Sequence, residues 1–207
     1  MSRRDFLKGV LAAGACNLLP SVGSAADAST PETKPAGSWA PSDPPNEPIG
    51  RARGIFPGRV VWTHDPKVAR WDGDTATGGW YEDRFTDPEL AASMLTRTLR
   101  LLAGADSDAG AWEKLFRHFN QEHGRGDVGY RPGEKVVVKL NMNCSQRRAE
   151  FTQGFYNTPQ LTLALLRQLV SEAGVRQEDL VVYDASRLMS DSIFVPAHEE
   201  FPGIRFE

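Results

Sequence analysis

Beyond residue 59, short apolar runs alternate with longer stretches in which an apolar residue recurs every three or four positions. The short runs are rich in Val and aromatic residues and predict strands at 59–64, 135–142, 179–184 and 203–206. The longer stretches predict helices at 87–104, 107–124 and 157–174. Strands that alternate with helices are typical of an α/β domain, so we expect a mostly parallel central sheet with flanking helices.

The ends of the first helix are marked by capping residues. Asp87 can cap the start with Pro88 at the first helical position, although Thr86 and Glu89 also have capping-box spacing. Gly104 is a suitable end because glycine readily adopts the left-handed conformation. The same reasoning predicts a cap at Ser107 or Asp108 for the second helix.

Two patterns predict what is buried. The third helix should bury a stripe formed by Leu161, Leu165, Leu166, Leu169 and Ala173. The unbroken Val run of residues 136–138 predicts a central strand that is covered on both faces. Trp71 and Trp80 frame a Gly-rich loop that we expect to pack back on the sheet, with a lid or a carbohydrate platform as alternatives.

The N-terminus resembles a bacterial twin-arginine export signal. Its pattern is filled by Arg3, Arg4, Phe6, Leu7 and Lys8 after Ser2. A short Gly- and Ala-rich apolar stretch follows, and small residues predict cleavage near Ala26. We therefore expect the twin-arginine translocase as a partner and a periplasmic or exported location. A weak lipoprotein box at Cys16 makes a lipid anchor the less favoured alternative.

The domain organisation follows from composition. Residues 1–26 are the predicted signal peptide, and residues 27–58 hold seven of the fourteen prolines, which predicts a disordered tether. Residues 59–207 form the predicted α/β domain.

Charge and missing motifs exclude several classes of protein. The net charge is −3, and the signal peptide carries a net charge of +2, so the chain becomes more negative when the signal is removed. Nucleic acid is therefore not an expected partner. No stretch is apolar enough for a permanent membrane span. Phosphate-loop, dinucleotide, hydrolase-elbow and zinc-protease motifs are absent from the sequence, which leaves the cofactor and any enzymatic activity undetermined.

Candidate chemistry lies where the predicted strands end, because parallel sheets bind ligands outside their carboxyl ends. The residues at these ends are His64, Asp65, Lys139, Asn141, Asn143, Asp184, Ser186 and Arg187. For an enzyme, Asp184 would be the base or a metal ligand, Lys139 an electrostatic stabiliser and Arg187 an anion clamp. His64 and Asp65 would complete a metal site with Asp184. Equally, Lys139 and Asp184 could form a structural ion pair, and Asp184 could cap a helix.

Several stretches resemble the exported branch of the family called domain of unknown function 362. They are VVWTHDPK (60–67), WDG (71–73), GRGDVGYRPGEK (124–135), KLN (139–141), TPQ (158–160) and YDASR (183–187). The family has no settled activity, so the resemblance implies no reaction. Its members are usually much longer, which implies that this chain corresponds to the N-terminal half of the usual domain.

Three interpretations of function stay open at this point. The first is an exported protein that binds a small polar or anionic ligand, or a metal, at the strand ends. The second is a non-catalytic accessory or binding protein of a periplasmic redox or envelope complex, with a protein partner. The third is a truncated fragment of a longer protein.

Overall fold

The computed structural model describes residues 42–44, 47, 49–143 and 156–207. The predicted signal, the cleavage position at Ala26, Cys16 and most of the predicted tether lie outside these residues. The chain divides into two compact units, Met1–Ile49 and Gly50–Glu207, and the helices and strands described below belong to the second. Within the described ranges, none of the helices combines the length and the hydropathy needed to cross a bilayer.

The centre of the second unit is a three-stranded parallel sheet. It consists of β1 (Val136–Lys139), β2 (Leu180–Tyr183) and β3 (Arg205–Phe206), in the order β1-β2-β3. Val181 in the middle strand lies opposite Val137 on one side and Arg205 on the other. The α/β class and the parallel sheet are therefore confirmed.

Two crossover connections join the strands. The first contains α4 (Pro159–Arg167), which continues as a π-helical turn at Gln168–Glu172. The second contains α5 (Asp191–Glu200). The two helices contact each other, as expected when consecutive right-handed crossovers lie on the same face of a sheet.

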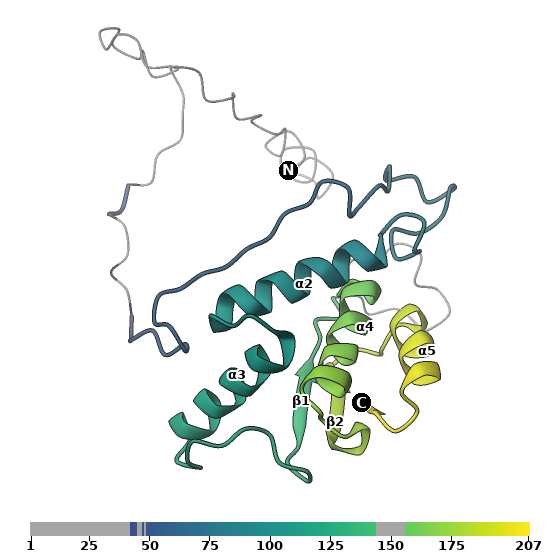
Figure 1. Ribbon diagram of the computed structural model, residues 1–207. Coiled ribbons are helices and arrows are strands. Elements are labelled where there is room, and N and C mark those ends of the chain that lie inside the picture. Colours follow the sequence, from purple (N-terminus) through teal and green to yellow (C-terminus); the bar gives the residue numbers. More distant parts are fainter. Residues whose placement is uncertain (1–41, 45–46, 48, 144–155) are drawn as a thin grey trace, which may run out of the picture. The chain divides into compact units, whose positions relative to one another are not determined.

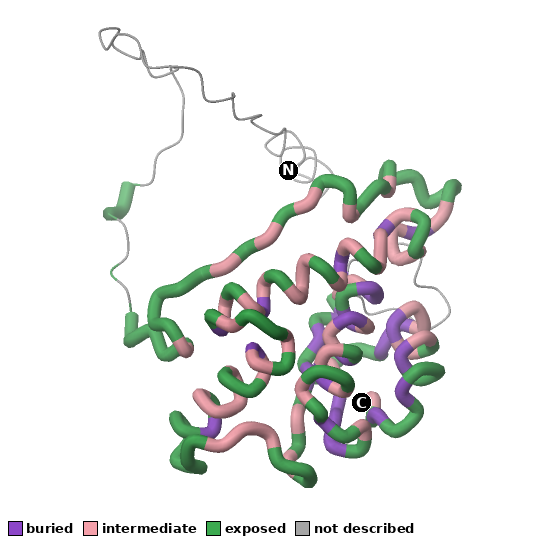
Figure 2. Tube along the Cα trace, in the orientation of Figure 1, coloured by how far each residue is buried: buried purple, intermediate pink, exposed green. Residues whose placement is uncertain are grey.

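The other two helices extend this layer. They are α2 (Pro88–Ala103), which packs against α4, and α3 (Asp108–Glu122), which packs against α2 (Figure 1). Buried residues gather on β2, α4 and α5, where Leu180 and Val182 belong to one core with Leu166 and Leu169 (Figure 2).

The predicted first strand is wrong. Residues 59–64 are extended but belong to no sheet within the described chain, and Figure 1 shows them running beside α2. The segment is held by side chains, because Thr63 Oγ1 lies 2.9 Å from Thr98 Oγ1 and the Arg59 guanidinium donates to the Leu101 carbonyl. A β-branched run fits a pleated surface, but it forms a strand only where another strand supplies the hydrogen-bond partners.

The predicted coverage of the Val run is also wrong. β1 lies at an edge of the sheet, where Val138 is buried but Val137 is 56% exposed. Parallel sheets are usually covered on both faces, whereas here α4 and α5 share one face.

The predicted ends of α2 and the predicted cap at the start of α3 are confirmed, whereas α3 ends at Glu122, two residues before the predicted Gly124. The Asp87 side chain accepts hydrogen bonds from the backbone N–H groups of Glu89 and Leu90, and Gly104 ends α2 with φ of 59°. Thr86 instead donates its hydroxyl to the Trp80 carbonyl, so the capping-box alternative is not used. Ser107 is the cap of α3.

The predicted burial of one residue in the third helix is wrong, and one helix was not predicted. Leu161 in the expected stripe is exposed, while the neighbouring Thr162 is buried, and its hydroxyl is satisfied by donating to the Thr158 carbonyl. The sequence analysis did not predict α5 because this helix contains Pro196, and proline is disfavoured inside a helix.

Candidate functional site

The carboxyl edge of the sheet is organised around Asp184. Its Oδ2 accepts from the Met142 backbone N–H at 2.7 Å, and its Oδ1 accepts from the N–H groups of Ser186 and Arg187 at 2.9 and 3.0 Å. The carboxylate thereby ties the chain after β1 to the loop after β2. These backbone donors, led by Met142, hold the pKa of Asp184 below its usual range.

This environment favours a positioning role for Asp184. A general base is most effective when its pKa lies near the working pH, and both carboxylate oxygens here already accept hydrogen bonds. The catalytic role assigned from the sequence stays a prediction, and the geometry favours the alternative in which Asp184 organises the backbone.

The remaining predicted residues differ in whether and how they contact the Asp184 carboxylate. The Lys139 ammonium donates to the Asn141 side chain, and the Asn141 backbone N–H donates to the Asn157 side chain. Ser186 and Arg187 reach Asp184 through their backbones and are exposed. Asn143 is exposed at the last position before residues 144–155, which are outside the described chain. The structure thus brings Lys139, Asn141 and Asp184 to one edge.

His64 and Asp65 do not follow a sheet strand, because the segment that carries them lies beside α2. The His64 ring meets Trp62 edge-on, and Asp65 Oδ1 accepts from the Lys67 N–H at 2.9 Å. Among the residues that the structure describes, no group of three His, Cys, Asp or Glu side chains could hold a metal ion. The predicted metal trio of His64, Asp65 and Asp184 is therefore not assembled here.

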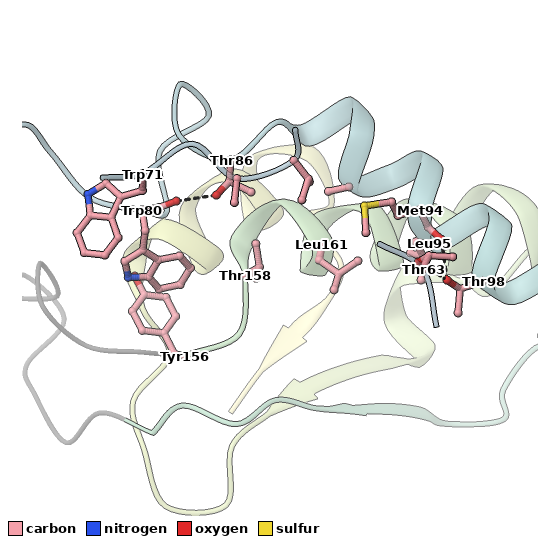
Figure 3. Close-up of a pocket in the computed structure, with 13 residues that line it drawn as sticks. Thr63, Trp71, Trp80, Thr86, Met94, Leu95, Thr98, Tyr156, Thr158 and Leu161 are labelled. Atoms are coloured by element: carbon pink, nitrogen blue, oxygen red, sulfur yellow. Dashed lines mark hydrogen bonds between the residues drawn. The ribbon is translucent and has the colours of Figure 1, made fainter. Parts of the chain in front are cut away.

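Sequence reasoning missed a second site, an apolar cleft of about 690 Å³. It lies between α2, the start of α4 and the polypeptide that precedes α2 (Figure 3). The described residues of its lining include no charged side chain and are Thr63, Val68, Ala69, Trp71, Trp80, Thr86, Ala91, Met94, Leu95, Thr98, Tyr156, Thr158 and Leu161. The exposure of Leu161 is explained by this position on the cleft wall.

One end of the cleft is aromatic. Figure 3 shows Trp71, Trp80 and Tyr156 grouped there, with Met94 and Leu95 at the opposite end. The rings of Trp80 and Tyr156 lie 4.9 Å apart between centroids. The Tyr156 hydroxyl is held outside this group by Ser192 and Ser190, at 2.8 and 3.1 Å. This anchoring fixes the ring as a rigid wall.

Several hydroxyl groups of the lining are already engaged within the protein. Thr63 and Thr98 hydrogen-bond to each other, and Thr98 also donates to the Met94 carbonyl at 2.8 Å. The Thr86 hydroxyl donates to the Trp80 carbonyl, also at 2.8 Å. The cleft consequently offers a ligand mainly apolar contact.

The two tryptophans that flank the loop of residues 72–79 line the cleft. Trp80, at the end of this loop, packs against the core that contains the strand residues Leu180 and Val182. Just after the loop, Gln160 Nε2 at the start of α4 donates to the Tyr81 carbonyl and to Asp83 at 2.7 and 2.8 Å. Trp71 Nε1 donates back to the Gly78 carbonyl within the loop. The sequence signal for the cleft was the density of aromatic residues at Trp71, Trp80 and Tyr81.

A buried carboxylate, Asp179, lies at the opposite end of β2. It accepts from the Tyr130 hydroxyl at 2.6 Å, the Gly133 N–H at 2.7 Å, Arg176 at 3.0 Å and Lys135 at 3.1 Å. The Tyr130 hydrogen bond, followed by that of Arg176, holds the pKa of Asp179 far below its usual range. Since these partners come from the turn before β1 and from the turn before β2, Asp179 is a structural tie between the two strands.

Comparison of the chain with protein-family models, curated proteins and solved structures finds no match. Among the described residues, the cleft and the carboxyl edge of the sheet are two places whose geometry supports a function.

Proposed function

We propose that this chain is an exported, non-catalytic binding protein whose ligand occupies the apolar cleft. The observation that carries the proposal is a cleft of about 690 Å³ whose lining, among the described residues, has no charged side chain. Sites for small molecules are typically concave and mostly apolar, with volumes of about 300–1,000 Å³.

The lining defines the chemical class of the ligand. A charged ligand would lose its hydration without gaining an ionic partner, which is strongly unfavourable in apolar surroundings. Trp71, Trp80 and Tyr156 favour a flat or ring-containing group at one end. Met94 and Leu95 favour a flexible apolar portion at the other, because methionine adapts to irregular shapes. We therefore infer an uncharged, elongated and largely apolar molecule.

A binding role without catalysis suits the same lining. Covalent or acid–base chemistry needs an activated nucleophile or a group that titrates near the working pH. The hydroxyls of Thr63, Thr86 and Thr98 are engaged in hydrogen bonds within the protein. The cleft thus favours retention of a ligand over its conversion.

Export is the second part of the proposal and is supported by Arg3 and Arg4 with their flanking residues. Replacing both arginines by lysine keeps the charge and removes the pattern. We expect the variant to be retained in the cytoplasm at full length, whereas the parent chain is recovered from the periplasm after cleavage near Ala26. Equal export of both chains would refute this part.

Ligand binding can be tested with N-phenyl-1-naphthylamine, an uncharged aromatic dye whose fluorescence rises in apolar surroundings. We expect saturable binding of one dye molecule per chain. Leu161→Glu introduces a charge into the wall of the cleft at a position that is 42% exposed, so the fold should tolerate it. Its dye affinity should fall by at least tenfold.

Val195 on α5 provides the matched control, because it is 44% exposed and lies outside the cleft lining. Val195→Glu adds the same charge to a helix surface and should leave the dye affinity unchanged. Equal affinities of the Leu161 and Val195 variants would show that the dye does not bind in the cleft and would contradict the proposal.

A second candidate is a small anionic ligand at the carboxyl edge. It is favoured by the convergence of Lys139 and Asn141 beside Asp184, with the exposed Arg187 close in sequence. In this candidate Lys139 and Arg187 bind the anion while Asp184 positions the backbone. Calorimetric titration with inorganic phosphate should show binding that Lys139→Gln abolishes, and an absence of heat with the parent chain would reject this candidate.

A further inference from the structure

Residues 60–65 alternate in exposure as a β-strand does, although they belong to no sheet in the described chain. The outward residues Val60, Trp62 and His64 are exposed, whereas the intervening residues Val61, Thr63 and Asp65 are partly buried. Val60 is 88% exposed and Trp62 is 77% exposed, which is unusual for such large apolar side chains.

The backbone of this segment is available for pairing. Within the described ranges, the N–H and C=O groups of residues 60–64 make no hydrogen bond to another part of the backbone. The segment is nevertheless held in place, because Thr63 bonds to Thr98 and Arg59 to the Leu101 carbonyl of α2. An extended, anchored row of unpaired backbone groups is a ready template for a strand from another chain.

We infer that residues 59–65 pair with the same segment of a second copy of this chain, antiparallel, with the two Trp62 side chains facing each other on a twofold axis. In this register Arg59 of each copy lies opposite Asp65 of the other, so two pairs of opposite charges form at the ends. Val60 then lies opposite His64, and Val61 opposite Thr63. Pro66 ends the pairing because it has no backbone N–H.

The charge pattern selects this arrangement. A parallel pair in the same register would place Arg59 opposite Arg59 and Asp65 opposite Asp65, and like charges directly opposite each other are destabilising. A shift by one residue would exchange the outward and inward faces. Leu101 is exposed in the same shallow depression as Val60 and Trp62, so pairing would also cover its side chain.

Cysteine cross-linking tests the register. In the full chain with Cys16→Ser and Cys144→Ser, Trp62→Cys places two cysteines directly opposite each other. Their Cα atoms would be about 4.5–5.5 Å apart, within the range for a disulfide. Val60→Cys is the matched control on the same exposed face, because its two copies would be about 14 Å apart. We expect mild oxidation to give a covalent dimer of the Trp62 variant and monomer for the Val60 variant.

Charge reversal tests the interaction itself without cysteine. Arg59→Asp or Asp65→Arg alone should weaken dimerisation by about tenfold in sedimentation velocity, because like charges then face each other at both ends. The double variant Arg59→Asp/Asp65→Arg restores opposite charges but lacks the Arg59 hydrogen bond to Leu101, so it should dimerise at least about threefold more tightly than either single variant. A monomeric parent chain, a double variant as weak as the single variants, or equal cross-linking of both cysteine variants would overturn the inference.

Discussion

Leu166 and Leu161 on α4 provide a direct test of how the tertiary structure selects the buried face of a helix. Both were expected in one buried stripe, yet Leu166 is fully buried in the main core and Leu161 lies on the open wall of the cleft. The same substitution to alanine at the two positions should therefore have different energetic costs.

The magnitudes follow from burial. Leu166→Ala removes three carbon groups from a closed core and leaves a cavity, which together should cost about 3 kcal/mol of unfolding free energy. Leu161→Ala removes the same atoms from a side chain that is partly in water, and no closed cavity forms. Its cost should be about 1 kcal/mol. For a domain of this size, a loss of about 3 kcal/mol lowers the melting temperature by about 6–12 °C.

Urea unfolding followed by circular dichroism measures both costs. The midpoints should fall for both variants, with the larger shift for Leu166→Ala and with unchanged slopes, which would indicate that only native stability was altered. Equal losses at the two positions, or a larger loss for Leu161→Ala, would refute the packing of α4 described above.

Asp179→Asn should make the free energy of unfolding depend less on pH under acidic conditions. The pKa of Asp179 is depressed in the folded state, so its carboxylate stabilises the fold above the unfolded pKa of about 3.9. This contribution is lost as the pH falls below that value. Urea midpoints between pH 5 and pH 2 should therefore fall less steeply for the variant, and parallel curves would contradict the assigned network. Val138→Thr should cost about 1–2 kcal/mol because it buries a hydroxyl, whereas Val137→Thr should cost less than about 0.5 kcal/mol because this side chain is exposed. Thermal unfolding measures the pair, and similar losses would show that both faces of β1 are covered.

The carboxyl edge was predictable from the sequence because it depends on local rules. Lys139 and Asp184 each end an apolar run, and parallel strands place such ends at one edge. The role of Asp184 was not predictable, since it depends on the Met142 N–H, which lies 42 positions earlier in the chain. The cleft was also not predictable, because its walls combine Thr63, Trp80 and Leu161 from three separate segments.

The sequence by itself indicated the α/β class through its alternation of strand and helix patterns. It also predicted the glycine end of α2 and limited the caps to two candidates for each helix, because these features depend on residues within one or two turns of each other. Only the tertiary structure decided that residues 59–64 are extended without a sheet partner in the described chain and that Val137 is exposed. A strand is completed by hydrogen-bond partners that are distant along the chain, and a face is buried only where another element covers it. Local pattern carries neither kind of information.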